Sequence, residues 1–591
     1  MKRFFKHFRL YFDRSFSKGL MAQLLWLSAL IIVIYAGLVG LSYVKSMYSA
    51  GADNTMGRWY DIMFLLVDPG TGNGSLPSAF TLLCALFGLV VFGGMLISVI
   101  SNVLERRMES YRNGETNYKM DHHVVVLGYN KSIPSLLKVI HERHKDAFVL
   151  LMTTRNSEEA RSWIRSNVSD VIYKKLVVLN GVRNASDDLE RLGLSNQVLE
   201  IFVLGEENEN DCDDKNMECV AMMAALVPAS VGKRIDCHVQ FASGAMFSIF
   251  KLEDVEDGIN RVFNVIPFNF DEIWAQKALA VVPKDDYYLP LDGKGITKDS
   301  PKHVHLVIFG MNEMSEALAV NAAHILHFPN YKDGDFDTCS QITFVGTEVN
   351  EKGMAFRARY GHLFSLARWR QVDASKCNAT ESDWHDPLSD ADSLSPYKHL
   401  GPTNFMDIQW EFINGDANDD RVRAYLDNAM TKANAITTLA VCSEDSSENV
   451  RVCLSLPEPT LCNAHEILVR QNESAVLLDQ LRKNARYAKV RAFGMMKNCY
   501  EENLLSDKYG KLINACYSGC NFDKSDEKWI GLSPIEKWSS NYSANMLFVK
   551  LRFLGLDTTK PLNDVDIENV VKSMDNKDAI QTTEHNRWIT E

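Results

Sequence analysis

The feature that most constrains this chain is a pair of long stretches without one charged side chain. Residues 20–44 and residues 69–104 are both free of charge and mostly apolar. A helix needs about 20 such residues to cross the hydrocarbon core of a bilayer, and both stretches exceed that length. The sequence therefore predicts an α-helical membrane domain with two transmembrane helices. The chain of 591 residues is long enough for several further domains.

A secretory signal peptide is the alternative for the first stretch, because four basic residues precede it: Lys2, Arg3, Lys6 and Arg9. A signal usually has an apolar core of about 7–15 residues and a small-x-small cleavage site. Residues 20–44 are longer than that and end without such a site. We therefore interpret them as a retained transmembrane helix.

The flanking charges orient the two helices. Residues 1–19 carry six Lys and Arg residues against one acid, three arginines lie in residues 105–112, and few basic residues lie between the stretches. The positive-inside rule places both termini in the cytoplasm of a plasma (inner) membrane, with residues 45–75 outside. The whole chain carries −13, and residues 1–104 contribute +4, so the remainder carries −17. That acidic body argues against nucleic acid as a partner.

The segment between the helices, "RWYDIMFLLVDPGTGNGS" at 58–75, joins an apolar half to a glycine-rich half. The apolar half is too short to cross a bilayer, so we expect it to dip in and return as a re-entrant pore loop. In a homotetramer one acid becomes a ring of four carboxylates, which is the usual lining of a cation-selective mouth. An exposed extracellular turn is the alternative. The residues predicted to form the selectivity filter are Asp68, Pro69, Gly70, Thr71 and Gly72.

Two glycines, Gly93 and Gly94, interrupt the second apolar stretch. Small residues in membrane helices often serve close helix packing. A gating hinge is the other interpretation, because hinges are few and often small residues that absorb backbone change. The sequence leaves both open.

The rest of the chain alternates strand and helix patterns, which indicates βαβ units and parallel sheets. The alternation restarts at residue 303 after a linker at 289–302, and the pattern weakens over 365–435, where 373–404 reads as an insertion or long loop. We predict two Rossmann-like domains in tandem. The predicted divisions are a basic cytoplasmic segment at 1–19, a pore domain at 20–104 with its second helix at 76–104, a linker at 105–121, Rossmann-like domains at 122–288 and 303–520, and a small α-helical module at 521–591.

The first strand–turn–helix segment has a degenerate dinucleotide fingerprint. Gly128 and Asn130 stand where the first two glycines of G-x-G-x-x-G belong, but Ile133 replaces the third. Asn130 can adopt a left-handed conformation, whereas Ile133 would crowd the helix against the strand. The carboxylate expected after the second strand is missing, because the sequence there is "TTRN". The turn is more typical of a scaffold than of a nucleotide site.

The second segment fits a nucleotide better. Gly310 and Asn312 occupy the first two fingerprint positions, and the small Ser315 occupies the third. Glu348 ends the next strand, where a carboxylate would bind ribose hydroxyls. We predict that any nucleotide prefers this second site, although both turns are compatible with a purely structural role.

An acidic loop follows the fourth predicted strand of the first domain. Hard oxygen ligands at such density are suited to Ca²⁺, which takes six to eight oxygens. The alternative is a solvated loop with acids placed favourably at a helix N-terminus, and no EF-hand spacing supports a metal. The carboxylates in question are Glu206, Glu207, Glu209, Asp211, Asp213 and Asp214.

The order of these segments resembles ion channels gated by RCK (TrkA-N type) domains, and residues 123–241 are most similar to the CASTOR/POLLUX family. The likeness rests on "VVVLGYN", "LNGVRNASDDLERLGLSNQ" and "IFVLGEENENDCDDKN". "SNYSANMLFVKLRFLGL" and "EHNRWITE" resemble the RyR repeat of ryanodine receptors, which looks incomplete at residue 591. The plant proteins have additional membrane helices, and the potassium filter TVGYG is absent here, so ion selectivity does not carry over.

The resemblance implies a homotetrameric, ligand-gated cation channel, not an enzyme, opened by a cytoplasmic ring of RCK domains. Its partners would be the lipid bilayer and the permeant cation, and Ca²⁺ or a nucleotide would be the gating ligand, with no cofactor certain. Two alternatives are a membrane-anchored nucleotide or metal sensor without conduction and a membrane-tethered dinucleotide oxidoreductase. The oxidoreductase would need an intact glycine fingerprint, which the sequence lacks.

Overall fold

The computed structural model divides into two compact units, an N-terminal unit, Met1–Thr116, and an α/β unit, Asn117–Glu591. Each is described by itself. The described residues are 20–48, 55–68, 78–90, 94, 97–118, 120–195, 197–227, 234–253, 255–281, 287–332, 335–373, 384–385, 406–432, 434–500, 507–519, 521–560 and 574–591.

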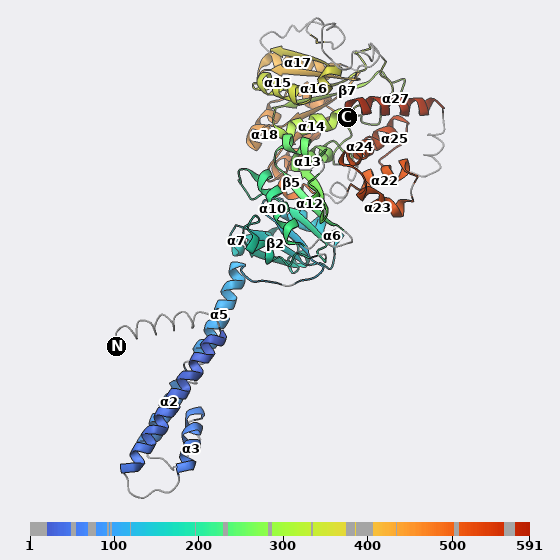
Figure 1. Ribbon diagram of the computed structural model, residues 1–591. Coiled ribbons are helices and arrows are strands. Elements are labelled where there is room, and N and C mark those ends of the chain that lie inside the picture. The colour runs from blue at the N-terminus through green and yellow to red at the C-terminus, as the bar shows by residue number, and fades with distance from the viewer. Residues whose placement is uncertain are drawn as a thin grey trace. The chain divides into compact units, whose positions relative to one another are not determined.

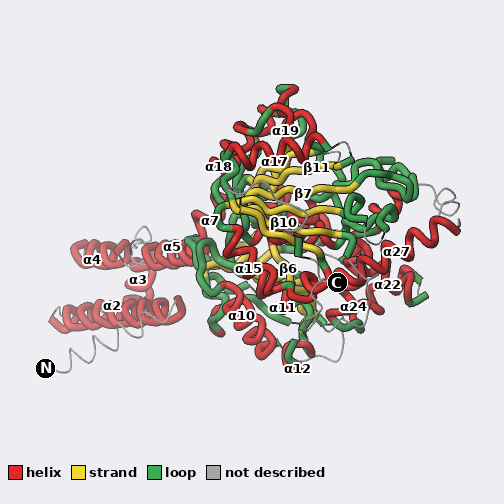
Figure 2. The backbone as a smooth tube through the Cα atoms, turned by 90° about the horizontal axis from the view of Figure 1, so that it is seen from above, coloured by secondary structure: helices red, strands yellow, loops and turns green. Residues whose placement is uncertain are grey.

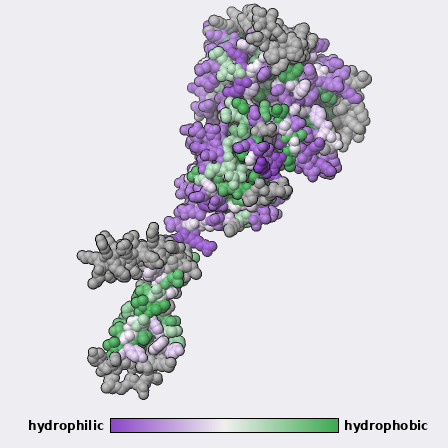
Figure 3. All heavy atoms as spheres, in the orientation of Figure 1, coloured by the Kyte–Doolittle hydropathy of each residue, from purple (hydrophilic) through white to green (hydrophobic). Residues whose placement is uncertain are grey.

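Four helices make up the described part of the N-terminal unit: α2 (Leu20–Tyr48), α3 (Thr55–Val67), α4 (Ser78–Gly88) and α5 (Ile97–Asn113). Among the described residues one helix is long and apolar enough to cross a membrane, over Leu25–Val44, and Ala79–Gly88 is apolar but shorter. Apolar side chains of α2 are exposed, such as Ile32 at 65%, and Figure 3 shows apolar residues gathered over this unit. The first predicted transmembrane helix thus has the expected surface, and the second stays a prediction.

The short helix α3 packs against both α2 and α4, and lies beside α2 in Figure 1. Ile62, Leu65 and Leu66 of α3 are buried together with Leu38 of α2. A Cβ atom on Gly88 of α4 would lie 2.3 Å from the carbonyl oxygen of Leu66. The α3–α4 crossing therefore requires glycine at position 88.

The first half of the α/β unit contains a six-stranded sheet with the order β3-β2-β1-β4-β5-β6. All its paired strands are parallel. Parallel strands need crossover connections, so helices are expected on both faces of such a sheet, and Figure 2 shows helices on both sides of the strands of the α/β unit. Its strands are β1 (Val124–Leu127), β2 (Val149–Thr153), β3 (Leu176–Asn180), β4 (Glu200–Val203), β5 (Ile235–Phe241) and β6 (Phe263–Asn269). Its helices are α6 (Ile133–Arg143), α7 (Ser157–Asn167), α8 (Asp170–Tyr173), α9 (Ser186–Glu190), α10 (Cys212–Leu226), α11 (Gly244–Phe250), α12 (Asp257–Asn260) and α13 (Phe270–Ala278).

The second half contains a seven-stranded sheet with the order β13-β12-β11-β7-β8-β10-β9, again with parallel pairing between its strands. The two sheets agree with the predicted α/β fold class. The strands are β7 (His303–Phe309), β8 (Ser340–Gly346), β9 (Arg368–Asp373), β10 (Ile408–Asn414), β11 (Ala435–Val441), β12 (Glu466–Arg470) and β13 (Val490–Phe493). The helices are α14 (Glu313–Ala323), α15 (Val349–Arg359), α16 (Gly361–Leu366), α17 (Asp420–Thr431), α18 (Ser446–Ser455), α19 (Glu458–Asn463) and α20 (Val476–Leu481), with short 3₁₀ turns at Ala485–Tyr487 and Met496–Asn498.

The structure adds strands that the sequence pattern did not reveal. β6 contains Pro267 and is an edge strand, which is where proline is tolerated in a sheet. β9 and β10 lie inside the stretch 365–435, where the pattern weakened, and β10 pairs between β8 and β9. Most of the expected long loop at 373–404 lies outside the described residues.

The C-terminal helices pack against both halves of the α/β unit, where Figure 1 draws them in orange and red beside α13 and α14. α22 packs closely on α24, so this helical group includes residues before the predicted start at 521. Its elements are α22 (Lys508–Tyr517), a 3₁₀ turn at Phe522–Lys524, α23 (Ser525–Ile530), α24 (Pro534–Asn545), α25 (Leu547–Phe553) and α27 (Met574–Thr590).

Buried polar contacts hold these helices in place. Arg552 of α25 forms a bidentate ion pair with Asp292 in the linker between the sheets, with N–O distances of 2.8 Å. In α27, Asn586 donates to Asp407, which pairs with His327 at 2.7 Å. One ion pair anchors the C-terminal helices to the linker, and the other contact anchors them to the second sheet. Removing one partner of a buried ion pair costs about 3–5 kcal/mol, so the Arg552–Asp292 pair is the stronger constraint of the two.

A buried carboxyl also lies at this linker. Glu466 of β12 is 1% exposed and accepts a hydrogen bond from the backbone N–H of Leu289. Burial raises the pKa of Glu466 to about 8, against the opposing effects of that N–H and of Arg491. The folded protein therefore holds a proton on Glu466 at pH values where the unfolded chain is ionised.

We expect Gly88→Val to destabilise the N-terminal unit by about 1–3 kcal/mol or more, because the added methyl groups meet backbone that cannot move aside. Gly40→Val is the matched control, since nothing lies within 4 Å of its Cβ position. Thermal unfolding of both variants in detergent checks this, and equal melting temperatures would contradict the α3–α4 contact.

Glu466 should make stability fall as pH rises. Since the pKa of Glu466 is raised in the folded state, unfolding releases a proton between about pH 4.5 and 8, and stability declines by up to about 1.4 kcal/mol per pH unit. Glu466→Gln should therefore be more stable than wild type at pH 8, with the difference shrinking toward pH 5. Glu458→Gln, an exposed carboxyl in the same half, should show no such trend. Parallel pH profiles for wild type and Glu466→Gln would refute the assignment.

Candidate functional site

The predicted pore segment begins with α3, a helix of 13 residues. At 1.5 Å per residue it is about 20 Å long, against about 30 Å for the hydrocarbon core. Asp68 follows the helix, is exposed, and its backbone N–H still donates to the carbonyl of Phe64 at 2.7 Å. The other predicted filter residues, Pro69, Gly70, Thr71 and Gly72, lie outside the described residues.

Of the two predicted hinge glycines, Gly94 is among the described residues. Gly93 lies outside the described residues, and Gly94 is π-helical, as Leu89 and Val90 are. No described residue comes within 4 Å of a Cβ placed on Gly94. Close helix packing is seen at Gly88, and the choice between packing and hinge for Gly94 stays a prediction.

In the first Rossmann turn the predicted residues contact other groups of the protein. Gly128 has a φ of +92°, and a Cβ there would meet the carbonyl oxygen of Leu204 at 2.2 Å. Asn130 accepts a hydrogen bond from the N–H of Ser132, and the Ser132 hydroxyl donates to Tyr500 at 3.2 Å. These contacts account for Gly128 and Asn130 as structural residues.

The acidic loop distributes its carboxylates among separate partners. Glu206 accepts from Thr153 and Thr154 after β2, and Asp213 accepts from the N–H groups of Ala242 and Ser243. Two members form ion pairs, Glu207 with Arg155 and Glu209 with the buried Arg183. Asp211 begins α10 with a φ of +56°, and Asp214 is exposed in its first turn. No group of three or more His, Cys, Asp or Glu side chains in the described part of the chain is arranged to hold a metal ion, and calcium binding by this loop stays a prediction.

The second Rossmann turn borders an open cavity of about 390 Å³. The cavity lies at the carboxyl ends of β7, β8, β10 and β11, and β7 stands between β8 and β11. This is the topological switch point at which open parallel sheets bind ligands. The second turn therefore has the accessible space in which a ligand could bind.

Three of the four residues predicted for this site line the cavity, namely Gly310, Asn312 and Glu348. Gly310 has a φ of +89°, which favours glycine. Ser315 is fully buried and forms a reciprocal capping box with Asn312 at the start of α14. Ser315 thus shapes the turn. Glu348 is the predicted side chain that is placed to bind a ligand, and its partner in the structure is Lys352, with which it forms an ion pair.

Sequence reasoning missed the charge of this cavity. Four further carboxylates line it, from loops that follow β10 and β11 and from α18, and Lys352 is the one basic residue among the described lining residues. Each loop follows the carboxyl end of a strand, and this position in the sequence could have identified the acids as lining residues. The negative lining favours hydroxyl or cationic groups of a ligand over a bare phosphate. The additional acids are Asp416, Glu444, Asp445 and Glu448.

Residues of the first half of the α/β unit contact the second Rossmann turn. Arg470 of β12 donates to the side-chain oxygen of Asn312 at 3.2 Å. Asp271 of α13 lies near Arg470, and burial raises the pKa of Asp271 to about 6, with Arg470 opposing. Glu313 accepts from the N–H of Gly244 at the start of α11. Contacts from α11 and α13 thus connect the first half directly to the start of α14.

No family model matches the chain. The probable ion channel POLLUX of Arabidopsis thaliana is 22% identical over 208 residues, covering 34% of this chain and 24% of POLLUX. The ion channel DMI1 of Medicago truncatula is 21% identical over 142 residues, covering 24% of this chain and 16% of DMI1. The curated relatives of this chain are named as ion channels. The matches span a quarter or less of their length.

Solved structures of the GsuK channel are also similar. GsuK bound to ADP aligns with a TM-score of 0.40 and 13% identity, covering 83% of this chain and 100% of that one. GsuK bound to NAD aligns with a TM-score of 0.39 and 13% identity, covering 84% and 85%. These scores are too low to transfer the geometry of a site. The resemblance to the CASTOR/POLLUX channels is confirmed by the relatives, which are named as channels and not as enzymes, and the RyR resemblance stays a prediction.

Glu348→Ala should weaken binding of a nucleoside such as guanosine to the full-length protein by about tenfold or more, because the ribose hydroxyls lose a hydrogen bond to a charged group, which contributes about 1.5–3 kcal/mol. Calorimetry with purified protein measures the change. Glu351→Ala, an exposed acid one turn further along α15, is the matched control. Equal affinities of wild type and Glu348→Ala would exclude ribose binding by Glu348.

Proposed function

We propose that the chain is one subunit of a homotetrameric cation channel of the plasma membrane, gated by its Rossmann-like sheets. Residues 20–44 and 76–104 form the two-helix pore in this proposal, and residues 58–75 form its re-entrant loop. The support comes from relatives that are named ion channels and from the exposed apolar surface of α2. Both termini are cytoplasmic by the positive-inside rule.

The observation that carries the proposal is the packing of α3. This helix is too short to span a bilayer, yet Ile62, Leu65 and Leu66 are buried against neighbouring apolar helices while Trp59 and Tyr60 are exposed. A short helix packed beside a membrane-spanning helix is suited to entering the bilayer and returning. Exposed aromatic residues at its start are typical of the membrane–water interface.

Asp68 then stands at the point where α3 ends and the glycine-rich loop begins. Four copies of the carboxylate around a common axis would concentrate cations at the mouth of the pore. Rings of carboxylates attract cations and repel anions, so Asp68 is the residue that we assign to selectivity.

Gating requires a ligand that binds the open and closed rings with different affinities. The cavity beside Gly310 and Glu348 is the site that we assign to that ligand. Arg470, Asn312 and Asp271 connect it to α13 of the first half. A ligand that displaces the start of α14 would change these contacts, and the linker at 105–121 would transmit the change to the second pore helix.

Purified protein reconstituted into vesicles should conduct cations, and Asp68→Asn should lower both cation conductance and the preference for cations over anions, because the ring loses its charge. Glu109→Gln is the matched control, since Glu109 is an exposed carboxyl of α5 outside the predicted pore loop. Ion flux and reversal potentials provide the measurement. Unchanged permeability ratios in Asp68→Asn would remove Asp68 from the filter, and no flux in wild type would reject the channel.

A further inference from the structure

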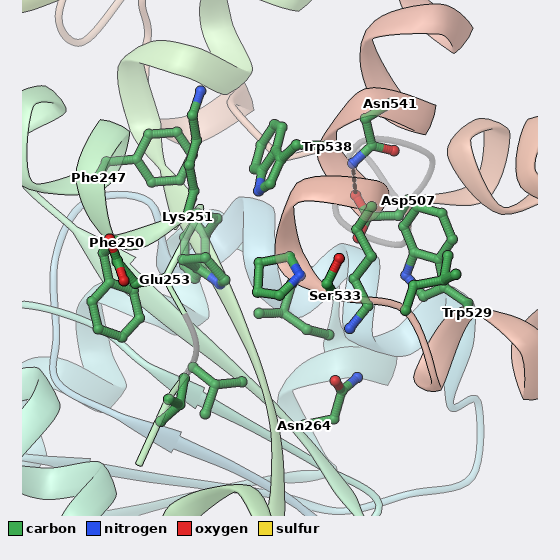
Figure 4. A pocket seen from close by; sticks show the side chains of 18 of the residues that line it. Phe247, Phe250, Lys251, Glu253, Asn264, Asp507, Trp529, Ser533, Trp538 and Asn541 are labelled. Atoms are coloured by element: carbon green, nitrogen blue, oxygen red, sulfur yellow. Dashed lines mark hydrogen bonds between the residues drawn. The ribbon is translucent and has the colours of Figure 1, made fainter.

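A second cavity, of about 510 Å³, lies between the first sheet and the C-terminal helices. One side is formed by β6, α11 and α13, and the other by Asp507 before α22 and by residues of α23 and α24 (Figure 4). It is separate from the cavity at the second Rossmann turn, with no lining residue in common. The proposed channel function assigns no role to it.

Aromatic side chains from both sides wall this cavity. Phe247 and Phe250 come from α11, and Trp529 and Trp538 come from the C-terminal helices. Phe247 and Trp538 meet edge to face across the seam with ring centroids 5.7 Å apart. Gly510 of α22 lies close to the ring of Trp529, since a Cβ there would be 3.0 Å from it. The aromatic walls are therefore built by close packing and give a flat ring surfaces on which to stack.

The lysine beside these aromatic rings, Lys251, already has partners for its ammonium. Lys251 is 8% exposed, donates to the Tyr542 hydroxyl at 2.5 Å, and has its ammonium 4.7 Å from the ring centroid of Trp538. It fixes Trp538 and Tyr542 against α11. Lys251 is thus a structural cation that holds the wall in position.

Lys537 of α24 is different. It lines the cavity, is half-buried, and its ammonium forms no hydrogen bond or ion pair with any residue that the structure describes. Burial lowers the pKa of Lys537, although the nearby Asp507 opposes the shift. Asp507 accepts a hydrogen bond from Asn541 at 2.9 Å and attracts the ammonium of Lys537 without a direct contact. A half-buried ammonium without a hydrogen-bonded acceptor favours an anion that can supply one.

We propose that this cavity binds a small molecule that carries a flat ring and an anionic group, with the ring against the aromatic walls and the anion on Lys537. A nucleoside phosphate and an aromatic carboxylate both have this chemistry. Its ligand would join the first sheet to the C-terminal helices, which also contact the linker through Arg552 and Asp292. A ligand at this site could therefore regulate the position of the C-terminal helices independently of the cavity at the second Rossmann turn.

Binding is measured by calorimetry and by thermal shift on the full-length protein in detergent. The probes are AMP and indole-3-acetate, which carry both features, adenosine, which lacks the anion, and inorganic phosphate, which lacks the ring. We expect AMP or indole-3-acetate to bind, and the one that binds more tightly identifies the source of the ligand. Adenosine and phosphate should bind at least about tenfold more weakly, because each lacks one of the two contacts.

Lys537→Gln should weaken binding of the ring-bearing anion by about tenfold or more, whereas Lys528→Gln, an exposed and unpaired lysine of α23 within the described residues, should leave it unchanged. Without a probe, Lys537→Gln should melt at the same or a higher temperature than wild type, since burial disfavours the ammonium more than the nearby Asp507 and Asp236 stabilise it. Equal affinity in Lys537→Gln, a lowered melting temperature of this variant, or no binding of AMP and indole-3-acetate at millimolar concentration overturns the proposal. The assay involves no ion flux, so its outcome is independent of whether the chain conducts.

Discussion

Parallel strand pairing is the constraint from which the α/β unit follows. Each parallel connection must cross over the sheet, and the crossovers place helices on both faces and the ends of successive strands along one edge. In the second sheet this brings Gly310, Glu348 and the acids after β10 and β11 around one cavity. In the first sheet the same geometry brings Gly128 and the acidic loop together, but carboxylates of that loop bind neighbouring groups of the protein. Two similar edges thus differ in how their polar side chains are used.

The C-terminal helices depend on a second constraint, the buried pair of Arg552 and Asp292. A buried guanidinium without its carboxylate is strongly unfavourable, so α25 must remain attached to the linker when the linker moves. Lys251 and Tyr542 hold the same helices to the first half, and Asn586 and Asp407 hold them to the second. A change in the angle between the sheets must therefore strain at least one of these contacts. This coupling is the physical reason for locating a regulatory site in their seam.

Much of the fold was accessible from local sequence patterns. Runs such as "VVVL" at 124–127 are buried strands because parallel sheets are covered on both faces, and the period of the helices is equally local. β6 escaped notice because Pro267 interrupts its pattern, and β9 because "RWRQVD" is polar. The candidate site was predicted in part, since Glu348 and Asn312 follow known fingerprint positions. Lys537, Trp538 and Phe247 could not be connected from sequence, because their contact depends on helices hundreds of residues apart.

The closure of the first Rossmann turn by Tyr500 has a consequence for the order in which the chain can mature. Ser132 and Ser135 bond to Tyr500 across separations of 368 and 365 residues, and Asp292 waits 260 residues for Arg552. A ribosome adds about 5–20 residues per second, so the first sheet exists for tens of seconds before these partners emerge. During that interval its turn and its linker hold polar groups without their final partners. The first half of the α/β unit is therefore the part of the nascent chain most in need of protection during synthesis.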